Sequence, residues 1–160
     1  MAQPQFRADP GQLAGWGVRF GAAIIDGLIV SIPVVVLVLV IVGLFAASTT
    51  AGVLGILVLG IAMLVFAFGY ATFLMARDGE HNGQTWGKQM LGIRAIRDNG
   101  QAWDFGSAAL REIVLKGLAV GIASSIIPLI PFLLNYLWPL WDDSDRALHD
   151  MAVKSHVVRA

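Results

Sequence analysis

The sequence predicts an all-α membrane protein with four transmembrane helices, the last two short or re-entrant, and a small cytoplasmic β-rich cap. Three observations predict this class. Hydrophobic residues make up 57% of the 160 residues and charged residues only 14%, whereas soluble domains contain about 25% charged residues. Two long stretches carry no charge at all. The Lys and Arg residues lie only before, between or after these stretches, as the positive-inside rule predicts for cytoplasmic segments.

The first uncharged stretch lies between Asp26 and Arg77. A membrane-spanning helix needs roughly 20 apolar residues, so this stretch has room for two helices and a turn. Its only polar break of small residues is Ser48-Thr49-Thr50-Ala51-Gly52, where we place the turn. We therefore expect helices over about residues 16–47 and 53–76.

The second uncharged stretch lies between Lys116 and Asp142 and contains Pro128 and Pro131. Proline interrupts a helix, so we expect a hairpin of two short helices, about 107–125 and 128–141. Four crossings place every basic residue and both termini in the cytoplasm. With three crossings, which the sequence leaves open, the basic residues of the tail would lie outside.

The chain outside the helices divides into three segments: a flexible N-terminus over residues 1–14, a cytoplasmic loop over 77–106 and a cytoplasmic tail over 142–160. Residues 15–160 are expected to form a single membrane domain. In the loop, Leu91–Arg97 alternates like a strand and Asp98-Asn99-Gly100 is a strong turn signal. We expect residues 91–103 and 153–158 to share one small sheet, with Gln101–Trp103 as the returning strand.

Several functions are poorly compatible with this composition. The 11 basic residues balance the 11 acidic ones, so no net field attracts nucleic acid. The absence of cysteine excludes disulfides and thiol chemistry. No catalytic triad, paired-carboxylate site or cofactor fingerprint is present, so we expect neither an enzyme nor a cofactor. The acidic residues near His149 lack calcium-loop spacing and are weak zinc ligands, and we expect no metal.

The segment Gly83-Gln84-Thr85-Trp86-Gly87-Lys88 is similar to a phosphate-binding loop but departs from it. Its two glycines are four residues apart rather than five, and Gln89 follows Lys88 where a phosphate loop has Ser or Thr. We interpret the segment as a tight turn that docks Trp86–Leu91 at the lipid headgroup level, where Trp is common.

Three blocks of sequence, in chain order, carry a family resemblance: Arg19–Asp26, Gly83–Arg94 and Arg146–Ala152. Together they resemble the RDD family of small prokaryotic membrane proteins, which is named for one arginine and two aspartates. The resemblance implies a multi-pass protein of the prokaryotic inner membrane, and monovalent cation/proton exchange has been attributed to some members. Carried over to this chain, it identifies the arginine as Arg19, the aspartates as Asp26 and Asp150 (with Asp145 as the alternative), the motif loop as Gly83, Gln84, Thr85, Gly87 and Lys88, and the tail motif as Arg146 and His149.

Arg19 and Asp26 lie two helical turns apart and hence on one helix face. Asp26 is expected near the inner boundary of the hydrocarbon, where an acid is either functional or firmly paired. Two interpretations stay open: a structural clamp that holds the first helix to the cap, or a site that handles ions or protons. We expect Arg19, Asp26 and Asp150 to form one charge cluster at the cytoplasmic end of the helices.

The sequence therefore carries two functional hypotheses. One is a transport-related protein whose partners are monovalent cations or protons. The other is a non-transporting accessory or scaffold subunit of a larger membrane complex. The lipid bilayer is the expected surrounding in both cases. Gly117, Gly121 and Ser125 recur every fourth residue, which allows close helix packing, either against the first helix or in a homo-oligomer.

Overall fold

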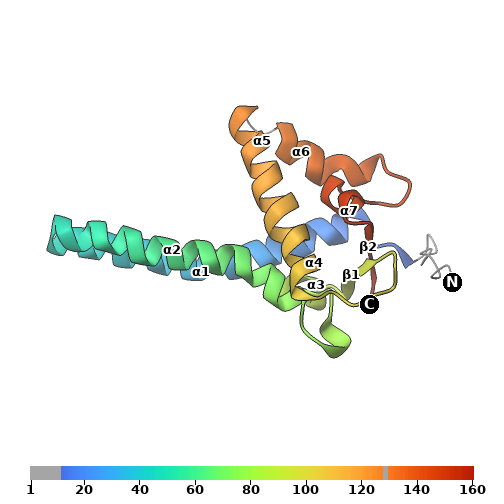
Figure 1. Cartoon of the computed structure of the whole chain (residues 1–160), viewed down its shortest axis with the longest axis horizontal. Helices are drawn as coiled ribbons and strands as arrows, with labels where there is room; N and C mark the ends of the chain where they lie inside the picture. Colours follow the sequence, from blue (N-terminus) through green and yellow to red (C-terminus); the bar gives the residue numbers. More distant parts are fainter. Residues whose placement is uncertain (1–11, 128–129) are drawn as a thin grey trace.

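The computed structural model describes residues 12–127 and 130–160. Its longest elements are α1 (Trp16–Ala47) and α2 (Thr49–Met75). Figure 1 shows them side by side as a hairpin that projects far beyond the rest of the molecule. Among the described residues, these two helices are long and apolar enough to cross a membrane. Most of their large apolar side chains are exposed, as expected of a surface that faces lipid rather than water.

The turn between α1 and α2 is shorter than we expected. Only Ser48 is non-helical, and α2 begins at Thr49 rather than near residue 53. The Ser48 hydroxyl accepts a hydrogen bond from the Ala51 N–H (3.1 Å), which caps the new helix at once. Gly52 packs against the Phe45 ring, and a Cβ there would lie 2.3 Å from the ring. Glycine therefore acts here as a packing residue of the helix and not as part of a turn.

The second half of the chain forms a shorter helical hairpin. α4 (Phe105–Ala109), the π-helical η3 (Leu110–Ala119) and α5 (Val120–Ile126) follow one another, and α6 (Ile130–Leu137) and the 3-10 turn η4 (Trp138–Leu140) return. Asp104 caps α4 in a capping box with Ser107. This helix therefore begins two residues before the expected residue 107.

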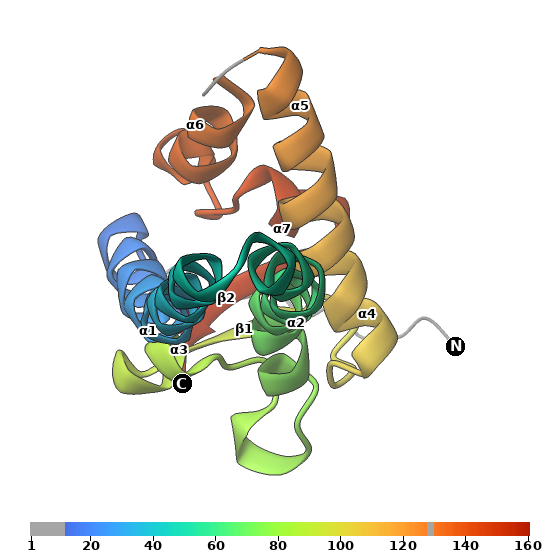
Figure 2. The ribbon, with the colours of Figure 1, turned by 90° about the vertical axis from the view of Figure 1, so that its left-hand side faces the viewer.

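The shorter hairpin packs on α2 (Figures 1 and 2). Gly117 of η3 approaches the Phe68 ring so closely that a Cβ would lie 2.6 Å from it. At Gly117 the small-residue face thus meets α2 and not the first helix, and the alternative of a homo-oligomer stays a prediction. Ile130–Leu140 is apolar but too short for the length criterion that α1 and α2 meet. Four crossings therefore stay a prediction.

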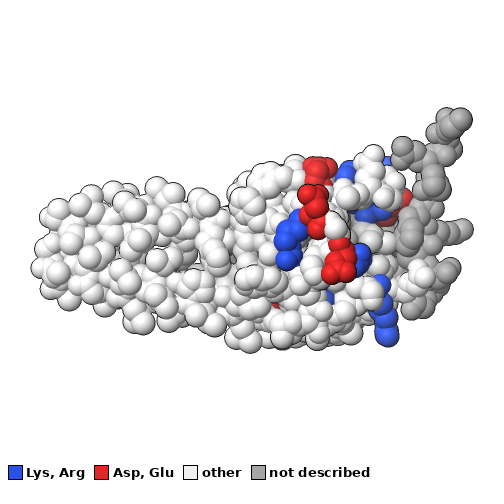
Figure 3. Space-filling model, turned by 90° about the horizontal axis from the view of Figure 1, so that it is seen from below, with Lys and Arg blue, Asp and Glu red and all other residues white. Residues whose placement is uncertain are grey.

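Short elements close one end of the molecule: η2 (Gly79–His81), α3 (Trp86–Met90), β1 (Ile93–Arg97), α7 (Leu148–Ala152) and β2 (Ser155–Arg159). We call this end, with the adjoining ends of the long helices, the polar end. Figure 3 shows the charged side chains gathered there, whereas the projecting half of the α1–α2 hairpin is bare of charge. The core of buried residues also lies here and includes Met75, Ile93 and Trp103.

Strands β1 and β2 pair antiparallel, with Ala95 opposite Val157. The two outer segments of the predicted sheet are therefore partners, but Gln101–Trp103 is not a strand. The buried Trp103 side chain donates instead from Nε1 to the Ala95 carbonyl (2.9 Å). A side-chain bond thus takes the place of a strand ladder, because the indole needs both burial and a hydrogen-bond acceptor.

The N-terminal segment reaches the same sheet. Residues 1–14 were expected to be flexible, and residues 1–11 lie outside the described part. Leu13, however, forms a bridge with Val158, and the Ala14 N–H donates to the Val157 carbonyl (2.9 Å). Ala14 is 1% exposed, so the chain is packed against β2 before α1 begins.

Candidate functional site

Arg19 and Asp150 meet at the polar end. Asp150 lies on α7 and is fully buried, and its carboxylate pairs with the Arg19 guanidinium. Arg19 also donates to the backbone carbonyl of Asp145. The carboxylate that binds Arg19 thus belongs to Asp150, while Asp145 contributes only its main chain.

Asp150 has a second cation that the sequence analysis missed. Arg111 of η3 is 2% exposed and donates from Nε to Asp150 Oδ1 (3.1 Å), with a second bond from Nη2 to the same oxygen. Burial alone raises the pKa of Asp150, but the charges around it, that of Arg111 above all, hold this pKa well below its usual range. Asp150 is therefore ionised and doubly paired.

Asp26 is bonded elsewhere. Its carboxylate accepts hydrogen bonds from the Thr85 hydroxyl (2.5 Å), the Gly87 N–H (2.8 Å) and the Tyr70 hydroxyl (2.9 Å). None of these donors is Arg19, so the expected three-residue cluster is divided into two parts. Asp26 joins α1 to the first turn of α3 and to α2, which is the contact that the clamp interpretation requires.

The motif loop is shaped to make this contact. A Cβ on Gly87 would lie 2.2 Å from the Ala22 carbonyl oxygen and 2.8 Å from the Asp26 carboxylate carbon, so only glycine fits. Gly83 has a φ of +79°, and a Cβ there would lie 2.1 Å from the Ala95 carbonyl oxygen. The buried Gln84 side chain donates to the Ile93 carbonyl (3.0 Å). The loop thus holds Thr85 and Lys88 in fixed positions.

The two tail-motif residues, Arg146 and His149, make contacts next to the Asp150 site. Arg146 forms a double ion pair with Asp142, with two N–O distances of 3.0 Å. His149 is buried, and its Nδ1 lies 2.9 Å from the side-chain oxygen of the fully buried Asn135. Burial lowers the pKa of His149 to about 3, so the ring is neutral at neutral pH. The contact between His149 and Asn135 joins α7 to α6.

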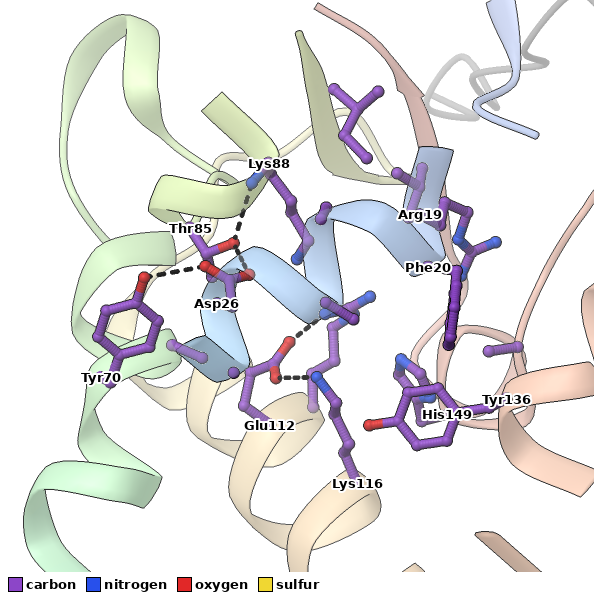
Figure 4. A pocket seen from close by; sticks show the side chains of 18 of the residues that line it. Arg19, Phe20, Asp26, Tyr70, Thr85, Lys88, Glu112, Lys116, Tyr136 and His149 are labelled. Carbon is purple, nitrogen blue, oxygen red and sulfur yellow. Dashed lines mark hydrogen bonds and ion pairs between the residues drawn. The ribbon is translucent and has the colours of Figure 1, made fainter. Parts of the chain in front are cut away.

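A cavity of about 360 Å³ lies between these parts and is lined by residues of α1, α2, α3, η3, α6 and the tail. Figure 4 shows Asp26, Lys88, Glu112 and Lys116 around it, with Tyr136 and His149 on the opposite side. Its Lys, Arg, Asp and Glu lining residues come from α1, α3 and η3: Arg19, Asp26, Lys88, Arg111, Glu112 and Lys116.

The charges on η3 form one network. Glu112 pairs with Arg111 and with Lys116, whose Nζ lies 3.1 Å from the Glu112 carboxylate. The i, i+4 spacing of Glu112 and Lys116 was readable from the sequence. No pattern in one sequence, however, connects Arg111 with a partner 39 residues away, which is why the network was missed.

Lys88 is the exception among the charged groups of the cavity. Its ammonium makes one weak contact, with the Met75 sulfur at 3.7 Å, and pairs with no carboxylate in residues 12–127 and 130–160. Burial, reinforced by the positive charge of Arg111, lowers the pKa of Lys88 to about 7. Lys88 is therefore the cavity group whose charge changes near neutral pH.

The comparison with known families agrees with this arrangement. The family model described as "RDD family" matches residues 13–154, a range that contains Arg19, Asp26, the motif loop and Asp150. The chain belongs to the RDD family. The resemblance drawn from the three sequence blocks is thereby confirmed, and the two long apolar helices agree with a membrane protein of this family. No curated protein and no solved structure matches this RDD protein.

Metal binding finds no further support in the geometry. Within the described ranges, no group of three His, Asp or Glu side chains is placed to hold an ion. Asp142 is occupied by Arg146, and His149 by Asn135. The expected absence of a metal stays a prediction.

Proposed function

We propose that this RDD protein has a transport-related function in the membrane and that the cavity at the polar end is its working site. The observation that supports this most is the ammonium of Lys88, which lies in the cavity without a carboxylate partner in the described chain. Perturbed ionisable groups in a cavity are typical of functional sites.

The charge balance explains how such a site can exchange a proton. Four cations (Arg19, Lys88, Arg111 and Lys116) face three carboxylates (Asp26, Glu112 and Asp150) in and directly behind the cavity. The net charge of these groups is one positive charge when Lys88 is protonated and zero when it is not. A monovalent cation can then replace the proton without changing the net charge. This is the cation/proton exchange attributed to some members of the family.

The test is ion flux through purified protein in liposomes that enclose a pH-sensitive dye. After a pH gradient is imposed, addition of Na⁺ or K⁺ should dissipate it with the natural protein. Lys88→Met should abolish this dissipation, whereas Lys154→Met, at an exposed lysine, should leave it unchanged. Equal dissipation by the Lys88 variant, or none by the natural protein, would contradict the proposal.

A non-transporting accessory or scaffold subunit is the second candidate, and Asp26 favours it. All three hydrogen bonds described for this carboxylate come from the protein itself, which suits a clamp better than an ion carrier. If the protein is such a subunit, neither the natural protein nor any variant should carry ion flux in liposomes. Gentle solubilisation of native membranes should then recover the chain in one defined larger complex. Recovery of the chain alone would contradict this second candidate.

A further inference from the structure

The cavity has more hydrogen-bond donors than acceptors. Its two carboxylates are occupied: Asp26 accepts three bonds, and Glu112 accepts from Arg111 and Lys116. The donors are only partly used. An ammonium carries three N–H groups, yet Lys88 contacts one sulfur and Lys116 one carboxylate.

Tyr136 adds a third donor from the opposite wall. Its ring projects from α6 into the space beside Lys116 in Figure 4. Within the described residues its hydroxyl has no hydrogen-bond partner, since the only bond described for Tyr136 uses its main-chain oxygen. Three polar groups from α3, η3 and α6 thus line the same cavity with unused N–H or O–H groups. An acceptor-rich anion would satisfy all three.

The cavity also changes character along its length. On α1 the lining passes from Arg19 and Asp26 to Gly27 and Val30, and on η3 from Arg111, Glu112 and Lys116 to Gly117. Phe68 of α2 completes the apolar part. The part of the lining beyond Asp26 on α1 and beyond Lys116 on η3 is therefore apolar, whereas near the polar end charged residues alternate with apolar ones such as Trp16 and Phe20. A ligand that matches both parts has a charged head and an apolar body.

We infer that the cavity binds the phosphate headgroup of an anionic phospholipid, with Lys88, Lys116 and Tyr136 as its ligands and the acyl chains against the apolar helices. The inference rests on the proposed function only in taking the cavity as the working site. A volume of about 360 Å³ lies at the lower end of ligand sites, which span roughly 300–1,000 Å³. It therefore admits a headgroup, while the chains remain outside along exposed residues of α1 such as Ile24 and Leu28.

Binding of such an anion is coupled to a proton. Lys88 is surrounded by Asp26 of α1 and by Arg111, Glu112 and Lys116 of η3, and its pKa is about 7. A phosphate beside the ammonium favours its charged form and raises this pKa. By linkage, headgroup binding above pH 7 takes up a proton from solution. A zwitterionic headgroup has no net charge with which to produce the same uptake.

The experiment is calorimetric titration of the full chain in detergent with short-chain dioctanoyl phosphatidylglycerol. Dioctanoyl phosphatidylcholine and inorganic phosphate are the comparison ligands, and pH 8 in two buffers of different ionisation enthalpy measures proton uptake. Phosphatidylglycerol should bind at least about tenfold more tightly than either comparison ligand, with uptake of a fraction of a proton. Lys88→Met should weaken it about tenfold, as expected for one charge-assisted hydrogen bond, and abolish the uptake.

Tyr136→Phe serves as the second variant, because it removes one oxygen and keeps the packing. It should weaken binding severalfold and keep the proton uptake, whereas Lys154→Met should change neither. Equal binding of phosphatidylcholine would overturn the inference, as would equal binding of inorganic phosphate, which would indicate a small-anion site. Unchanged binding by both cavity variants would also overturn it. If the protein carries ion flux but does not bind the lipid, only this inference is contradicted. If it binds the lipid but carries no ion flux, only the proposed function is contradicted.

Discussion

Asp150 carries one negative charge that two arginines share. It is fully buried, Arg111 is 2% exposed, and the Arg19 side chain is 13% exposed. Arg111 also pairs with Glu112, so it is the cation that both buried carboxylates have in common. Removing one partner of a buried ion pair leaves an uncompensated charge, which costs more than the pair itself contributes.

We therefore expect Arg111→Ala to lower the free energy of unfolding by about 3–5 kcal/mol. Arg19→Ala should cost less, because water reaches that guanidinium and Arg111 still neutralises Asp150. Arg111→Lys, which keeps the charge but loses the forked geometry, should lie between them. Denaturant unfolding in detergent measures all three, and an Arg19 effect equal to or larger than that of Arg111 would contradict this ranking.

Gly87 is the second residue for which the structure predicts a clear effect of substitution on stability. A methyl group there meets a backbone carbonyl of α1 at 2.2 Å, and backbone cannot move aside as a side chain can. Gly87→Ala should therefore destabilise the protein by about 1–3 kcal/mol and separate α3 from α1. Gly17→Ala is the matched control: nothing lies within 4 Å of its Cβ position, and alanine favours a helix. A stable Gly87→Ala protein would show that α3 is not clamped as described.

At the scale of elements, Asp26 is the link between α1 and α3. Its bond to the Gly87 N–H fastens the first turn of a five-residue helix, and helices this short are not stable alone. Asp26→Asn keeps the size but replaces one acceptor oxygen by a donor group. We expect the amide of Gly87 and its neighbours to exchange hydrogen faster in this variant, while the exchange of β1 stays unchanged. Unchanged exchange in α3 would contradict the clamp.

The sequence predicted elements best where the signal is local. Hydropathy located both long helices, and alternation beside a turn signal identified β1 and its partner β2. The assignment of Trp103 to a strand was wrong, because its partner is a carbonyl reached by the indole and not a neighbouring backbone. The start of α2 was misplaced because one serine cap replaces a five-residue turn. The spacing of Arg19 and Asp26 showed a shared face. It contained no information that Asp26 meets Thr85 or that Arg19 shares Asp150 with Arg111.

At the scale of the whole molecule, Lys88 connects the stability of the fold with pH. The pKa of Lys88 is about 7 in the folded state and 10.5 in an unperturbed lysine. Between these values the unfolded chain binds more protons, so the free energy of unfolding rises with pH. The charged groups that act on Lys88 are those of Asp26, Arg111, Glu112 and Lys116.

We expect the melting temperature of the protein in detergent to rise between pH 7 and pH 9, because the folded state loses the buried charge of Lys88 over this range. Lys88→Met should be more stable than the natural protein at pH 7 and should lose this part of the pH dependence. Lys154→Met is the control with the same change in charge at an exposed position. A natural protein and a Lys88 variant with parallel pH profiles would contradict the assignment.

The gathering of charge at one end leads to a prediction of topology. With four crossings, the polar end and both termini lie in the cytoplasm. A reporter that is active only in the cytoplasm should then be active when fused after Ala160, and one that is active only in the periplasm should be silent there. The same pair of reporters fused after Ser48 should give the opposite result. Periplasmic activity at Ala160 would favour three crossings.

The pairing of Arg19 with Asp150 and of Leu13 with Val158 has a consequence for biosynthesis. The ribosome produces the first partner of each contact well over a hundred residues before the second. Until then, Arg19 and Arg111 have no Asp150 to neutralise them, and the edge of β1 is open. Closure of the polar end thus has to wait until α7 and β2 have been made. A protein cut short before α7 leaves Arg19 without its carboxylate, Arg111 with Glu112 alone, and an open strand, which is the kind of exposed surface that chaperones and membrane proteases act on.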